Sequence, residues 1–274
     1  MTYRERWLRT MRYQAVDHPP LSLPGPWPAT RKRWEQEGLP IGADLRDYWG
    51  VEEPGGLKSV AIETIFCPPF KEVILEEHDG FVIKINSRGV KERNFPDGSS
   101  MPEFLEYPVK GRESLGWLNE RLNPDNPDRV APDWLARAEA DRTAGSVVFC
   151  NGGMYFGFLN ERMGTETLLT TYYDDPDFIH AVNDLQCRCC EMALRTSLPA
   201  FQLDCIAYHE DMGYKNGPLI SPAMFKEFEV DYASRICARF GLVYYGCCDP
   251  LDGKMAEVRQ IPNVRKVSMS PWVK

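Results

Sequence analysis

The stretch Gln202-Leu-Asp-Cys-Ile-Ala-Tyr-His-Glu-Asp-Met-Gly213 decides the fold class. Residues 201–208 form an apolar run of strand length, and a polar segment follows them. Ser221-Pro222 then starts a helix to about Phe240, because serine is a favoured N-cap and proline suits the first helical position. Residues 242–246 are the next short apolar strand. A strand, a helix and a strand in this order predict one unit of a parallel α/β sheet.

The same alternation continues on both sides of that unit. Further strands are expected at residues 59–66, 146–150 and 264–269. Helices are expected at 131–142, 155–163, 165–172, 175–197 and 251–260. We therefore predict a single domain over residues 1–274, with regular βα units from residue 131 onward.

Residues 1–130 are less regular. Helices are predicted at 3–13, 30–37 and 110–122. Asp79-Gly80 separates two alternating segments and predicts a β-hairpin over residues 72–87. Residues 95–108 read as a loop. No glycine-rich nucleotide-binding loop follows any predicted strand, so nothing indicates a dinucleotide or nucleotide fold.

Composition excludes several classes of function. The 274 residues carry a net charge of −8, which argues against non-specific nucleic-acid binding. No apolar run reaches the roughly 18 residues of a membrane span, and the N-terminus lacks the apolar core of a signal peptide. We expect a cytoplasmic protein without a membrane or nucleic-acid partner. The nine cysteines are an odd number and do not indicate a disulfide framework.

Three ionisable residues, His209, Glu210 and Asp211, follow the strand at 201–208. In a parallel barrel the active site lies at the carboxyl ends of the strands, so these are the candidate catalytic residues. Neighbouring acids and a histidine should also perturb one another's pKa. The alternative is a solvated strand end with a structural ion pair to Lys215.

Cys247 and Cys248 are adjacent at the end of another predicted strand. Side chains alternate along a strand, so one thiol of the pair is expected to face the site while the other packs outward. A thiolate there is a zinc ligand or a nucleophile. The alternative is two small buried residues, which is also our interpretation of Cys189 and Cys190 in a helix.

Other strand ends supply polar and aromatic side chains. Gly152 and Gly153 permit close approach to a ligand, and an ordinary tight turn explains them equally well. The predicted substrate-binding residues are Asn151, Tyr155, Tyr208, Lys215, Ser270 and Trp272.

Together these segments resemble the uroporphyrinogen decarboxylase family. The resemblance rests on three groups of residues. The first is the opening helix with Val16-Asp-His-Pro-Pro20, and the second is Glu210-Asp-Met-Gly213 with Ser221-Pro-Ala-Met-Phe225. The third is the pair of strand ends Gly246-Cys-Cys-Asp-Pro250 and Val267-Ser-Met-Ser-Pro-Trp272. It implies a (β/α)8 barrel. The family's barrel continues beyond the Ser-Pro-Trp segment, so we expect a barrel that is incomplete at the C-terminus.

The resemblance is strongest to the family's zinc-dependent, corrinoid-linked methyltransferases. It implies a methyltransferase that moves a methyl group between a small methylated substrate and a corrinoid protein. Zinc would be held by Cys248, Cys247 and His209, although the family's His-x-Cys reads Gly246-Cys-Cys248 here. The alternatives are a metal-free, porphyrinogen-type decarboxylase, with Asp211 stabilising the intermediate, and a non-catalytic barrel. A homodimer is left open.

Overall fold

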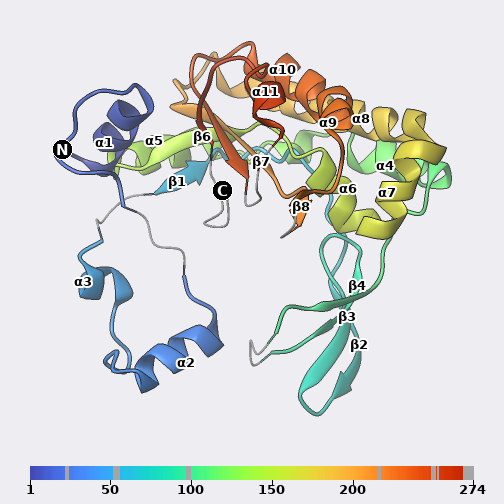
Figure 1. The fold of residues 1–274 in the computed structure, drawn as a ribbon, viewed down its shortest axis with the longest axis horizontal. Helices are drawn as coiled ribbons and strands as arrows, with labels where there is room; N and C mark the ends of the chain where they lie inside the picture. The colour runs from blue at the N-terminus through green and yellow to red at the C-terminus, as the bar shows by residue number, and fades with distance from the viewer. Residues whose placement is uncertain are drawn as a thin grey trace.

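The computed structural model describes residues 1–21, 25–51, 56–96, 100–214, 217–247, 251 and 253–267. Its centre is a parallel sheet with helices on one face (Figure 1). A smaller antiparallel sheet and an N-terminal helical segment stand beside this centre. No helix within the described ranges is long and apolar enough to cross a membrane.

The central sheet is five-stranded, and all its neighbouring strands are parallel. Its strands, in spatial order, are β1 (Leu57–Ser59), β6 (Val147–Asn151), β7 (Cys205–Glu210), β10 (Val243–Cys247) and β11 (Val264–Val267). The predicted parallel α/β class is therefore confirmed. Among the described residues the sheet is open, because β1 and β11 are its two edges. A closed barrel is not formed by these strands.

The strand predicted over residues 59–66 is only partly correct. β1 ends at Ser59, and beyond it the Ile62 amide donates to the Val60 carbonyl at 2.8 Å, so the chain turns away from β6. Val60, Ile62 and Phe66 are nevertheless buried. Their hydrophobicity reflects packing into the core, which an apolar run cannot distinguish from pairing in a sheet.

The predicted helices of the second half are present, but the one expected at 251–260 is helical, in its described part, only over Met255–Val258, and the one after Ser221 contains a π-helical segment. They are α5 (Trp134–Thr143), α6 (Phe156–Met163), α7 (Thr165–Asp174), α8 (Pro176–Ser197), α9 (Pro222–Phe225), the π-helical η3 (Lys226–Val230), α10 (Asp231–Cys237) and α11 (Met255–Val258). The Asp175 side chain accepts from the Phe178 amide at 3.3 Å, and Ser221 accepts from the Met224 amide at 3.2 Å. Both predicted N-caps are thus in place. Helices α8 to α10 lie over one face of the sheet (Figure 1).

The predicted hairpin is confirmed as β2 (Val73–His78) and β3 (Phe81–Ile85), but it belongs to a larger unit. β4 (Lys91–Asn94) and β5 (Glu103–Glu106) extend it to a four-stranded antiparallel sheet. The expectation of a loop over residues 95–108 is therefore wrong at Glu103–Glu106. The two hydrophobic residues of β5, Phe104 and Leu105, are exposed, so β5 lacks a buried face that would reveal it in the sequence.

The remaining elements are short. They are α1 (Tyr3–Met11), α2 (Pro28–Gln36), α3 (Leu45–Trp49), η1 (Arg112–Ser114), α4 (Leu115–Arg121), η2 (Pro127–Arg129), β8 (Gly213–Tyr214) and β9 (Gly217–Pro218). Helix α1 packs Tyr3, Trp7 and Met11 against Val147 and Cys205, at the amino ends of β6 and β7. This contact covers the end of the sheet opposite to the predicted site.

Candidate active site

Strand β7 separates the predicted catalytic residues between two environments. His209 lies in register with Gly246 of β10 and is exposed, whereas Tyr208 and Glu210 are fully buried. The cause is the two-residue period of a strand, which directs neighbouring side chains to opposite faces. His209 therefore faces the open side of the sheet, and Glu210 faces the helices.

A cavity of about 500 Å³ lies at the carboxyl ends of β6 and β7. Its lining includes Asn151 from the end of β6 and His209 from β7. Helix α6 contributes Glu161 and Arg162, and the antiparallel sheet contributes Arg88 from its β3–β4 turn. The structure thus brings two of the predicted site residues, Asn151 and His209, to one cavity at the edge where parallel α/β proteins bind their ligands.

The loop after β6 is shaped by its glycines. A Cβ on Gly152 would lie 2.5 Å from the Ile206 Cγ2 atom, and Gly153 has a φ of +104°. The Asn151 side-chain oxygen accepts from the Gly153 amide at 3.2 Å. These contacts favour the tight-turn interpretation of the two glycines, with Gly153 also on the cavity wall.

Charges of both signs line the cavity. The Glu161 carboxylate bridges two arginines, with one oxygen 3.2 Å from Arg88 Nη1 and the other 3.0 Å from Arg162 Nη1. Burial lowers the pKa of Arg162 to about 10, and its guanidinium packs over the Phe66 and Phe158 rings. Glu92 is also buried and accepts from Asn86 Nδ2 at 2.7 Å.

Behind the sheet, Glu210 forms a buried carboxyl pair with Glu229 of η3. Glu210 accepts from the backbone amides of Tyr155 and, at 2.8 Å, Gly157, which precede and begin α6. The Tyr208 hydroxyl lies 2.7 Å from Glu229 Oε2 and 3.3 Å from Glu210 Oε1. Burial raises the pKa of Glu210 to about 7, and burial together with Glu210 raises the pKa of Glu229 well above its usual range.

The two carboxyls of the pair differ in their hydrogen-bond partners and in how strongly their pKa values are raised. Two amides at the start of α6 stabilise a negative charge on Glu210. Burial and the neighbouring Glu210 both raise the pKa of Glu229, because two neighbouring buried carboxyls do not both ionise readily. The expected pKa perturbation at Glu210 is therefore present, but its cause is burial, and the hydrogen bond from Glu229 acts in the opposite direction.

The other predicted site residues are dispersed. Tyr155 and Tyr208 are fully buried and their rings pack together, with centroids 5.9 Å apart. Asp211 is exposed just beyond β7. Cys247 occupies the register position of Glu210, and so does not lie opposite His209. Four further predictions, Lys215, Cys248, Ser270 and Trp272, lie outside the described residues.

No group of three or more histidine, cysteine, aspartate or glutamate side chains within the described ranges is placed to hold a metal ion. Of the three expected zinc ligands, only His209 has a side chain that the structure describes, so the zinc site is not tested. The role of Cys248 stays a prediction.

Glu229 and Arg162 escaped the sequence analysis. Both occupy positions in buried helical stripes: Glu229 is four residues after Phe225, and Arg162 is four residues after Phe158. A charged residue at helical spacing among apolar ones is rarely buried without a partner. This pattern in the sequence could have identified both residues as buried charged groups.

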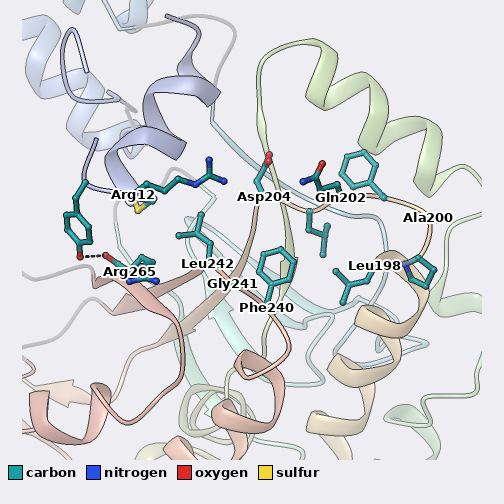
Figure 2. A pocket seen from close by; sticks show the side chains of 14 residues that line it. Arg12, Leu198, Ala200, Gln202, Asp204, Phe240, Gly241, Leu242 and Arg265 are labelled. Atoms are coloured by element: carbon teal, nitrogen blue, oxygen red, sulfur yellow. Dashed lines mark hydrogen bonds between the residues drawn. The ribbon is translucent and has the colours of Figure 1, made fainter. Parts of the chain in front are cut away.

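A larger cavity, of about 780 Å³, lies at the opposite end of the sheet (Figure 2). It is lined by Arg12 after α1, Gln202 and Asp204 before β7, and Leu242 before β10. These are the amino ends of the strands, where residues of barrel-type proteins serve stability. The Asp204 carboxylate accepts from Arg4 and from the Val148 amide, so it anchors α1 to the sheet.

No protein-family model and no curated protein matches this sequence. The resemblance to the uroporphyrinogen decarboxylase family therefore stays a prediction. Among solved structures, a methyltransferase from Methanosarcina mazei superposes with a TM-score of 0.55 at 13% sequence identity. The superposition covers 98% of this chain and 76% of that chain. The chain thus shares, over nearly its whole described length, the fold of that methyltransferase.

Proposed function

We propose that this chain is a methyltransferase that moves a methyl group between a small molecule in the carboxyl-end cavity and a corrinoid protein. The carrying observation is the cavity itself, which holds His209 and Asn151 in a fold similar to that of a methyltransferase. The central sheet then corresponds to five strands of a barrel-type fold. The corrinoid partner is an expectation from the sequence resemblance.

In this proposal His209 is the base that accepts the proton of the reacting heteroatom. When a thiol accepts a methyl group, its S–H bond breaks and the proton passes to the imidazole. The new S–C bond forms as the methyl–donor bond breaks, and that bond's electron pair stays with the donor. Histidine suits this task because its ordinary pKa is close to neutral. Asn151 provides an amide to orient the substrate.

Zinc remains part of the expectation, with Cys248 as its proposed thiolate ligand. When bound, zinc would lower the pKa of a substrate thiol as a Lewis acid. The described residues do not assemble a ligand set. The role of His209 as a proton acceptor is therefore argued independently of the metal.

The first experiment uses methylcobalamin as the methyl donor and a set of small thiols as acceptors. The methylated thiol is measured by mass spectrometry, with the full chain purified in the presence of zinc. We expect His209→Ala to lower the rate by about 10²-fold or more, the usual contribution of a positioned proton-transfer group. His78→Ala is the matched control, because His78 lies exposed on β2 of the antiparallel sheet. Absence of methylated product with every thiol, or equal rates for the two variants, contradicts the proposal.

A further inference from the structure

Arg162 is a buried arginine in the wall of the cavity, and the proposed function gives it no role. The Arg162 side chain is 1% exposed, and its Nη1 donates to the Phe158 carbonyl at 2.9 Å and to Glu161. Its Nε is buried and has no hydrogen-bond partner in the part of the chain that the structure describes. A buried charged group with an unused donor is costly, and such groups are retained where a ligand completes them.

The surroundings of Arg162 already accommodate an oxyanion. Glu161 is half-exposed, and its two oxygens lie against Arg162 and Arg88, one on each. The carboxylate of Glu161 thus occupies the space between the two guanidinium groups, which shows that this space accommodates a carboxylate. Glu161 reaches it from the neighbouring position on α6, and the cavity opens beside it.

The charged residues of the cavity wall come in equal numbers of each sign. Arg88 and Arg162 carry two positive charges, and Glu92 and Glu161 carry two negative charges among the lining residues. Lys84, whose Nζ lies 3.7 Å from Glu92, also pairs with Glu72 at 3.4 Å. The positive and negative charges of this cluster therefore balance, although the whole chain carries a net charge of −8.

We propose that Arg162 is a specificity-determining residue that binds a carboxylate group on the small substrate. The guanidinium fork matches the two oxygens of a carboxylate, and the poorly solvated site strengthens the pair. The carboxylate would be held on the α6 side of the cavity, with the reacting heteroatom toward His209 and Asn151. This inference rests on the proposed function for the identity of the reacting end, but the recognition of the carboxylate is tested by binding alone.

The test compares two ligands, one with a carboxylate and one with a neutral hydroxymethyl group in its place. We would measure calorimetric binding of 3-mercaptopropionate and of the neutral 3-mercapto-1-propanol to the full chain. We expect the carboxylate to bind at least about tenfold more tightly, as one charge-assisted hydrogen bond provides. Equal affinities for the two ligands overturn the inference.

Two variants with opposite expected effects follow. Arg162→Met should remove the preference for the carboxylate and leave the affinity for the alcohol unchanged. Glu161→Gln should strengthen carboxylate binding several-fold, because it removes the negative charge that competes for Arg162. Since Glu161 is half-exposed, its replacement keeps the test valid even if Arg162→Met does not fold. A Glu161→Gln variant with unchanged or weaker carboxylate binding contradicts the proposal.

The matched control is Arg137→Gln, because Arg137 is exposed and pairs with its helical neighbour Asp133, away from the cavity. Carboxylate-selective binding without methyl transfer would leave the inference standing and reject the proposed function. Methyl transfer that is equal for the acid and the alcohol would leave the function standing and reject the inference.

Discussion

His209 and Glu210 are neighbours in the chain and lie in opposite environments. His209 faces the cavity, whereas Glu210 is enclosed between the sheet, the start of α6 and Glu229. The two residues therefore have separate tasks. His209 is the candidate for chemistry, and Glu210 holds the loop that carries Asn151 and Gly153 to the cavity wall.

The carboxyl pair predicts an unusual dependence of stability on pH. Its pKa values are raised in the folded protein, so the folded state holds protons that the unfolded chain releases above a pKa of about 4.5. This contribution to the free energy of unfolding is present at low pH and declines as pH rises through about 7. Each fully buried carboxyl contributes a slope of up to about 1.4 kcal/mol per pH unit.

Replacing Glu229→Gln should reduce this slope. The amide cannot ionise, and Glu210 alone keeps the amides of Tyr155 and Gly157 as partners. We would measure melting temperature from pH 5 to pH 8 by circular dichroism and compare Glu227→Gln, a replacement of an exposed glutamate in the same helical segment. Parallel pH profiles for the wild type and Glu229→Gln would refute the raised pKa of Glu229 in the folded protein.

At the scale of elements, local signals located most helices. Serine or aspartate before proline marked the starts of α8 and α9 correctly, because a cap acts only through its own turn. Prediction from local sequence was wrong for part of residues 59–66, because the chain leaves the sheet after Ser59 while its apolar side chains stay buried. It also failed at β5, whose pairing with β4 depends on a partner ten or more residues away.

The cap at Ser221 gives a quantitative test at this scale. Ser221→Ala removes the acceptor of the Met224 amide and should lower the free energy of unfolding by about 1 kcal/mol. Ser234→Ala within α10 is the control, because alanine is favoured inside a helix and no cap is lost. Urea unfolding measures both variants. A loss at Ser234 equal to that at Ser221 would show that capping is not the cause.

At the scale of the whole molecule, α1 joins the N-terminal segment to the sheet. Trp7 is 2% exposed and packs with Val147, Cys205 and Leu242, which begin or precede three different strands. The helix is also held by Arg4, whose guanidinium pairs with Asp204. The amino ends of the strands are thereby covered while the carboxyl ends keep their cavity.

Trp7→Ala should therefore destabilise the whole domain. Removing a fully packed tryptophan typically lowers the free energy of unfolding by about 3–5 kcal/mol. The exposed Trp27 is the matched control, and Trp27→Ala should have a small effect on global unfolding. Urea denaturation followed by circular dichroism compares them. A global stability of Trp7→Ala within 1 kcal/mol of the wild type would mean that α1 is not part of the cooperative unit.

The sequence by itself determined the α/β class, the parallel order of strands and helices, and the edge at which Asn151 and His209 meet. These follow from periodicity, capping and the alternation of side chains, all of which act over a few residues. Only the tertiary structure decided that the described sheet is open, that Glu210 pairs with Glu229, and that Arg162 and Arg88 meet at Glu161. Glu210 and Glu229 are 19 positions apart in the chain, and Arg88 and Glu161 are 73 positions apart. The edges of the sheet, β1 and β11, are also far apart in the sequence. Packing and burial therefore select these contacts after the local elements have formed.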